Sequence, residues 1–158
     1  MLPHSLSSDR LPGLARTHTA LAGWVVVILI VGLLPLRNFV GHPHWGSIAW
    51  TIPPSLWHSR RLYFDLVANV GLFYPLGLLL ARLMPVAIKA RTARIIGAGA
   101  LLSLGIEFFQ IYCHNRHPSP YDVASNVIGT GLGLWTAPRL FSCRFLRTLL
   151  PSKADTPH

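Results

Sequence analysis

The stretch from residue 95 to 113 is almost entirely apolar, yet it carries a carboxylate and an amide on one side. Ser103, Glu107 and Gln110 are spaced at i, i+4 and i+7, so in a helix they share one face. A helix this apolar needs cover on nearly every side, which a bilayer provides. An ionisable group near mid-membrane costs about 2.5–3.5 kcal/mol on insertion scales, so Glu107 predicts polar partners on neighbouring helices.

The composition also favours a membrane protein. Of the 158 residues, 51% are hydrophobic and only 12% are charged, whereas soluble domains carry about 25% charged residues. So short a soluble chain has no interior large enough for this many apolar side chains. The net charge of +9 could indicate nucleic acid. The basic residues, however, stand just outside the apolar runs, as membrane-flanking charges do, and we expect no nucleic-acid partner.

Four apolar runs are long enough to cross a bilayer. They predict an all-α integral membrane protein, a bundle of four transmembrane helices at about 20–36, 62–84, 95–113 and 121–137. A secretory signal peptide is the competing interpretation of the first run. We disfavour it because no small-residue cleavage site follows the run.

Three further segments complete the predicted organisation. Residues 1–19 are polar and rich in serine and proline, which predicts a flexible tail before the membrane domain of residues 20–137. Residues 138–158 form a basic tail. The connection between the first two spans, residues 37–61, contains three tryptophans. Tryptophan at this density is typical of a membrane interface, so we expect an interfacial Trp-rich loop.

A short motif, aromatic-Asp-x-x-x-Asn, occurs twice. It opens the second span with Asp65 and Asn69, and the fourth span with Asp122 and Asn126. One span lies between the two copies, so both helices run in the same direction across the membrane. The motif therefore predicts the same polar groups at the same end of two parallel helices.

The distribution of basic residues predicts which side each loop faces. Ten of the fourteen lie in the terminal tails and in the loop between the second and third spans, and four lie in the other two loops. We therefore expect a multi-pass protein of the cell membrane, with both termini in the cytoplasm.

On this topology the polar groups meet at the outer ends of three helices. The candidate catalytic residues are the acids Asp65, Glu107 and Asp122. The candidate ligand-binding residues are the amides and the arginine that accompany these acids, namely Asn69, Gln110, Arg116 and Asn126. Together they predict a pocket open to the outer face, acidic at its floor and basic at its rim, where Arg116 is joined by Arg60 and Arg61.

These motifs resemble the VanZ-like family, named for a teicoplanin-resistance protein. The resemblance covers residues 62–137, about half of the chain. It rests on Asp65-x-x-x-Asn69 followed by Phe73-Tyr-Pro-Leu-Gly77, then Ser103-x-x-x-Glu107-x-x-Gln110, then Arg116, then Asp122-x-x-x-Asn126-x-x-Gly129. It implies a small multi-span membrane protein. Some members are linked to reduced susceptibility to glycopeptide antibiotics, but the resemblance carries no reaction over to this chain.

The first functional hypothesis is a site for an amphiphile such as a lipid-linked cell-envelope precursor. Arg116, with Arg60 or Arg61, would engage an anionic head group. The three acids would hold a divalent cation that bridges to phosphate, or Glu107 would act as a general acid or base. Whether the protein is an enzyme stays open.

Two other functions compete with this one. Gly129 and Gly133 form a GxxxG motif, which would suit a non-catalytic protein that assembles through helix contacts, although these glycines could pack within the chain. A proton or cation transport role is disfavoured because the inner halves of the spans look wholly apolar. The acids also have structural interpretations: Asp122 as a helix cap, and Glu107 as part of a buried polar network with Arg116 or an asparagine.

Overall fold

The structure, a computed structural model, describes residues 10–51, 59–84, 86 and 90–142. Within these residues it contains four α-helices and two short 3-10 turns and no strand longer than an isolated bridge. The helices are α1 (Arg10–Leu33), α2 (Arg60–Leu83), α3 (Arg91–Gln110) and α4 (Pro120–Ser142). The all-α prediction is confirmed. The predicted basic tail beyond residue 142 lies outside the described residues, as does Trp57.

The helix bounds differ from the predicted spans mainly at α1. This helix begins at Arg10, within the segment predicted to be a flexible tail, and ends at Leu33. Its end precedes Pro35, because proline lacks a backbone N–H and also restricts the residue before it.

Three helices are long and apolar enough to cross a membrane, by length and composition: Leu14–Leu33 of α1, α2 and α3. They indicate a multi-pass membrane protein. Many large apolar side chains point outward, among them Val26 and Leu101, as a bilayer-covered surface would require. Asp122, Asn126 and three glycines make α4 less apolar, so its role as a fourth span stays a prediction.

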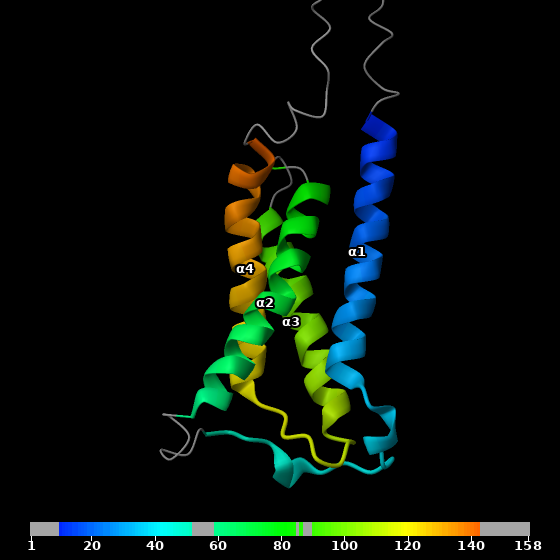
Figure 1. Ribbon diagram of the computed structural model, residues 1–158, viewed down its shortest axis with the longest axis vertical. Helices are drawn as coiled ribbons and strands as arrows, with labels where there is room; N and C mark the ends of the chain where they lie inside the picture. The colour runs from blue at the N-terminus through cyan, green and yellow to red at the C-terminus, as the bar shows by residue number, and fades with distance from the viewer. Residues whose placement is uncertain (1–9, 52–58, 85, 87–89, 143–158) are drawn as a thin grey trace, which may run out of the picture.

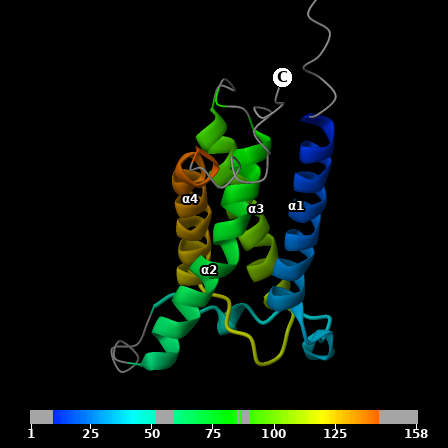
Figure 2. The same ribbon diagram turned by 45° about the horizontal axis from the view of Figure 1, so that its top comes forward.

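The helices run alternately up and down, so that the start of α1 and the end of α4 lie at one end of the bundle (Figures 1 and 2). The α1–α2 connection and the α3–α4 connection lie together at the opposite end. α2 and α4 therefore begin at the same end, which brings the two copies of the Asp-x-x-x-Asn motif side by side.

α2 and α4 form the most extensive helix contact, and glycines allow it. A Cβ atom at Gly129 or Gly133 would collide with the backbone of α2 at Val70 or Tyr74, and one at Gly77 would collide with the backbone of Thr130. The GxxxG face is thus filled by α2 of the same chain, the alternative that the sequence had left open.

The loop end of the bundle is closed by backbone pairing between the two connections. The Val40 N–H donates to Tyr112 O at 2.9 Å, the His114 N–H to Asn38 O at 2.7 Å, and the Ala49 N–H to Pro118 O at 2.8 Å. The segment after α1 therefore crosses this end of the bundle, at the bottom of Figure 1, and covers the helix ends there.

Candidate functional site

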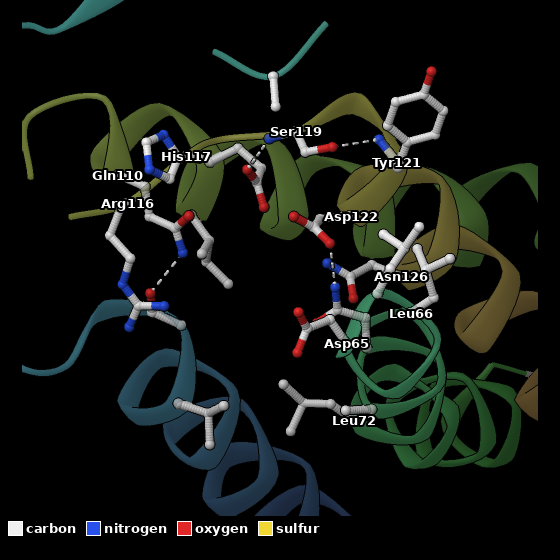
Figure 3. Close-up of a pocket in the computed structure, with 18 of the residues that line it drawn as sticks. Asp65, Leu66, Leu72, Gln110, Arg116, His117, Ser119, Tyr121, Asp122 and Asn126 are labelled. Atoms are coloured by element: carbon white, nitrogen blue, oxygen red, sulfur yellow. Dashed lines mark hydrogen bonds between the residues drawn. The ribbon is translucent and has the colours of Figure 1, made fainter. Parts of the chain in front are cut away.

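A cavity of about 490 Å³ lies at the loop end, between the four helices and the two connections. All seven residues that the sequence predicted for the pocket line it: Asp65, Asn69, Glu107, Gln110, Arg116, Asp122 and Asn126. Figure 3 labels five of them, Asp65, Gln110, Arg116, Asp122 and Asn126, which converge from α2, α3, α4 and the α3–α4 connection. Arg61 also lines the cavity, whereas Arg60 does not.

The two copies of the repeated motif meet in one side-chain hydrogen bond. Asn69 Nδ2 donates to Asp122 Oδ1 at 2.7 Å, and both residues are half-buried. The motif places each pair on one helix face, and the close α2–α4 packing brings the two faces together. Asp122 is therefore held by an amide of the other motif copy rather than by the start of its own helix.

The start of α4 is capped by Ser119, whose Oγ accepts the N–H of Tyr121 at 3.1 Å. In a full capping box, the acid three residues later would accept the N–H of the capping serine. Here the Ser119 N–H donates instead to Glu107 Oε2 at 2.9 Å. Glu107 thus has a structural partner, but that partner is the backbone of the α3–α4 connection, not Arg116 or an asparagine.

Gln110 and Arg116 both hold the end of α1. Gln110 Nε2 donates to Gly32 O at 2.8 Å, and Arg116 Nη2 donates to Leu34 O at 2.6 Å. The last carbonyls of a helix have no partner within the helix, so these two side chains satisfy them. The Gln110 carbonyl oxygen and the remaining guanidinium N–H groups have no further hydrogen-bond partner among the described residues.

Asn126 of α4 also lines the cavity and is only 5% exposed. Its Nδ2 donates to Ser103 Oγ at 2.9 Å, which explains the serine on the polar face of α3. Its Oδ1 is buried and has no hydrogen-bond partner among the described residues. A buried acceptor without a partner costs about 1–3 kcal/mol, so this oxygen marks a place where a donor is missing.

Asp65 and Arg61 are the exposed charges of the cavity wall, one turn apart on α2. Neither forms an ion pair with any residue in the described part of the chain, and the same holds for Glu107 and Asp122. The cavity therefore contains three carboxylates and two guanidinium groups that do not neutralise one another in direct contact.

The remaining lining has an apolar part that was not foreseen from the sequence. It comes from α1, α2 and α3: Ile28, Val31, Leu66, Leu72, Phe73 and Ile106. The connections and the start of α4 add further polar lining residues, namely Thr51, Asn115, His117, Ser119 and Tyr121. Ile28, Phe73 and Ile106 also belong to a buried core cluster. α1 showed no polar stripe in the sequence, so nothing there indicated that its last turns border the pocket. The cavity is thus polar near the loops and apolar toward the middle of the bundle.

The predicted cation site has no close cluster of ligands. Within residues 10–51, 59–84, 86 and 90–142, no three His, Cys, Asp or Glu side chains gather closely enough to hold a metal ion. Asp65, Glu107 and Asp122 line one cavity but are spread along its wall. The imidazole rings of His42, His44 and His114 adjoin at the loop end, with centroids 4.6 Å and 4.9 Å apart for the two nearest pairs, and they too fall outside any such group.

Comparison with known proteins identifies one family. The model of the VanZ/LLP1 family matches residues 14–142, from α1 to the end of α4. The match includes every residue of the cavity lining. No curated protein and no solved structure matches the chain.

Proposed function

This chain belongs to the VanZ/LLP1 family, and from that premise we propose that it binds a lipid-linked cell-envelope precursor or a similar amphiphile in its cavity. The anionic head group would lie near Arg61 and Arg116, and the hydrocarbon chain would lie along the apolar lining. On the charge distribution of the loops, the cavity lies at the outer side of the membrane.

The observation that carries this proposal is the polarity gradient within one cavity. Charged and amide groups line its loop end, and Ile28, Leu72 and Phe73 line its depth. Ligand sites of this kind combine an apolar lining with a few polar groups that fix orientation. An amphiphile with a phosphate head and an acyl tail is likewise polar at one end and apolar at the other, so it would match the cavity along its length.

The arginines support an anionic head group. A guanidinium presents several N–H donors in a plane and pairs well with phosphate or carboxylate oxygens. Arg61 is exposed at the cavity wall and has no ion-pair partner in the described part of the chain. Arg116 has donors left after its bond to the Leu34 carbonyl.

The experiment compares two lipids by native mass spectrometry of the detergent-purified protein. Dioleoyl phosphatidic acid carries a phosphate, and dioleoylglycerol has the same chains without it. We expect preferential binding of phosphatidic acid, weakened about tenfold in Arg61→Ala, the magnitude of one lost charge-assisted hydrogen bond. Arg116→Ala should lose binding too, and Arg116→Lys separates lost charge from lost support of α1.

The matched control is Arg94→Ala, because Arg94 is exposed on α3 but does not line the cavity. It should bind phosphatidic acid as the wild type does. Equal binding of the two lipids, or equal weakening by Arg61→Ala and Arg94→Ala, would contradict a head-group site in the cavity.

Reduced susceptibility to glycopeptides is the cellular consequence that we propose for this binding. If the protein retains an envelope precursor, a bacterial host that expresses it should tolerate more teicoplanin than one that expresses Arg61→Ala at the same level. Unchanged tolerance in the wild type would separate lipid binding from antibiotic susceptibility.

The competing functions have less support. The face of Gly129 and Gly133 is filled by α2 of the same chain, so assembly of two chains through this pair would require α2 to move away. For transport, the buried Phe73, Ile28 and Ile106 stand where a polar path toward the other end would continue.

A further inference from the structure

We propose that the head group carries a cationic amine beside its anionic group, and that Asp65, Asp122 and the unpartnered Oδ1 of Asn126 bind the amine. This inference rests on the proposed amphiphile site and names the chemical class of its ligand: a zwitterionic phosphate-amine head. It assigns the phosphate to Arg116, on the side of α1, and to Arg61 at the start of α2, and it assigns the ammonium to the acceptors of α2 and α4.

Arg116 lies apart from the two aspartates of the cavity, whereas Arg61 lies one turn from Asp65 on α2. Figure 3 shows Arg116 and Gln110 on the side of α1, and Asp65, Asp122 and Asn126 on the opposite side, at α2 and α4. Gln110 and Arg116 are fixed on their side by the α1 carbonyls, and Asp122 is fixed on the other by Asn69. A ligand with a single negative charge would satisfy one wall only.

The α2–α4 wall offers acceptors that have no donors. Asn126 Oδ1 is fully buried and without a partner within the described residues, although the side chain lines the cavity. Asp65 makes no hydrogen bond or ion pair with any described residue. An ammonium group has three N–H donors and no acceptor, so it matches a wall of this kind.

The two copies of the motif differ in a way that fits this role. In one diagonal pair, Asn69 donates to Asp122, which closes that pair within the protein. In the other, the amide of Asn126 turns its N–H group to Ser103, so Asp65 receives no equivalent bond. One of the two Asp–Asn pairs between the motif copies is therefore hydrogen-bonded and the other is not. The acid of the unbonded pair, Asp65, lines the cavity.

The charge balance agrees with this assignment. The cavity holds Asp65, Glu107 and Asp122 against Arg61 and Arg116, with no direct ion pair in the described part of the protein. A phosphate alone would add negative charge beside three carboxylates, which raises the electrostatic free energy of the complex. An amine on the same head group compensates for that charge where the carboxylates lie.

The experiment uses two lipids that differ only at the amine. Dioleoyl phosphatidylethanolamine has a free ammonium, and its N-acetyl derivative keeps the phosphate and chains but has a neutral amide. Binding of each to the full-length protein is measured by native mass spectrometry. We expect about a tenfold preference for the free amine, as for one charge-assisted contact. Asp65→Asn should abolish the preference without weakening binding of the N-acetyl lipid, and Asp65→Glu should restore it.

Each outcome decides between the proposals. Equal binding of the two lipids, each tighter than dioleoylglycerol, overturns the amine site and leaves the phosphate site standing. Binding no tighter than that of dioleoylglycerol overturns the proposed function itself. A preference for the amine that persists in Asp65→Asn also overturns the inference, because the amine would then lie elsewhere.

Discussion

Asn69 of α2 donates a 2.7 Å hydrogen bond to Asp122 of α4, and this bond joins the two copies of the chain's one repeated motif. It shows why the motif occurs twice: each helix supplies an acid and an amide at the same depth, and the contact crosses between them. The corresponding bond between Asp65 and Asn126 is not made, and that asymmetry leaves the exposed Asp65 carboxylate and the buried Asn126 Oδ1 without a donor among the described residues.

The first prediction concerns this asymmetry. Asn69→Ala removes the donor and leaves a half-buried carboxylate without it, so we expect a loss of about 1–3 kcal/mol of stability. Asp65→Ala removes an exposed carboxylate with no described partner, so the thermal midpoint in mild detergent should change little. If both substitutions lower the thermal midpoint by similar amounts, then Asp65 also makes a stabilising contact and the asymmetry between the two motif copies is disproved.

The second prediction separates the charge of Glu107 from its hydrogen bond. Glu107→Gln keeps an oxygen that can accept the Ser119 N–H but removes a half-buried charge, so the thermal midpoint should stay equal or rise. Glu107→Ala loses the acceptor and should lower stability by about 1–3 kcal/mol. If Gln lowers the midpoint as far as Ala does, the charge itself stabilises the fold, and Glu107 is a structural ion rather than a group kept for a ligand.

The third prediction tests the close approach of α2 and α4. At Gly77 an added methyl group would collide with the backbone of Thr130, so Gly77→Ala should cost about 1–3 kcal/mol, as overpacking does. Gly71 is the matched control on the same helix, because nothing lies within 4 Å of its Cβ position. Gly71→Ala should be neutral or stabilising by about 0.5–1 kcal/mol. The reverse order of the two midpoints would disprove the helix packing.

The fourth prediction is the orientation in the membrane. Ten of the fourteen basic residues lie on the side assigned to the cytoplasm, so a reporter fused after residue 158 should behave as cytoplasmic in a bacterial host. A fluorescent protein that folds only in the cytoplasm should be bright there, and alkaline phosphatase, which needs an oxidising compartment, should be inactive. The opposite pair of results would place the cavity on the inner side.

The sequence predicted the all-α class and the convergence of the acids and amides because both follow from local rules. Helical spacing puts Ser103, Glu107 and Gln110 on one face, and one intervening span makes α2 and α4 parallel. The family resemblance is confirmed by the match over residues 14–142. The seven proposed site residues line one cavity because six of them lie near the loop end of a helix and Arg116 lies in the α3–α4 connection at that end.

Partner choice could not be predicted, because it depends on distances of an ångström between helices. The sequence alone does not indicate that Glu107 accepts a hydrogen bond from the Ser119 backbone rather than pairing with Arg116. Nor does it indicate that Arg116 and Gln110 donate to carbonyls at the end of α1. The early start of α1 at Arg10 was also missed, since polar residues at a helix start resemble a tail.

The most direct test of the cavity as a ligand site is photo-crosslinking in vesicles, followed by peptide mass spectrometry. The probe is a phosphatidylethanolamine with a diazirine in its acyl chain. Our account predicts labelling of the cavity lining, at Leu72 and Phe73, above the labelling of the outward-facing Leu101 and Phe108. Excess unlabelled phosphatidylethanolamine should suppress the labelling of Leu72 and Phe73. Labelling spread evenly over the outward-facing residues, with none specific to Leu72 and Phe73, would contradict the account.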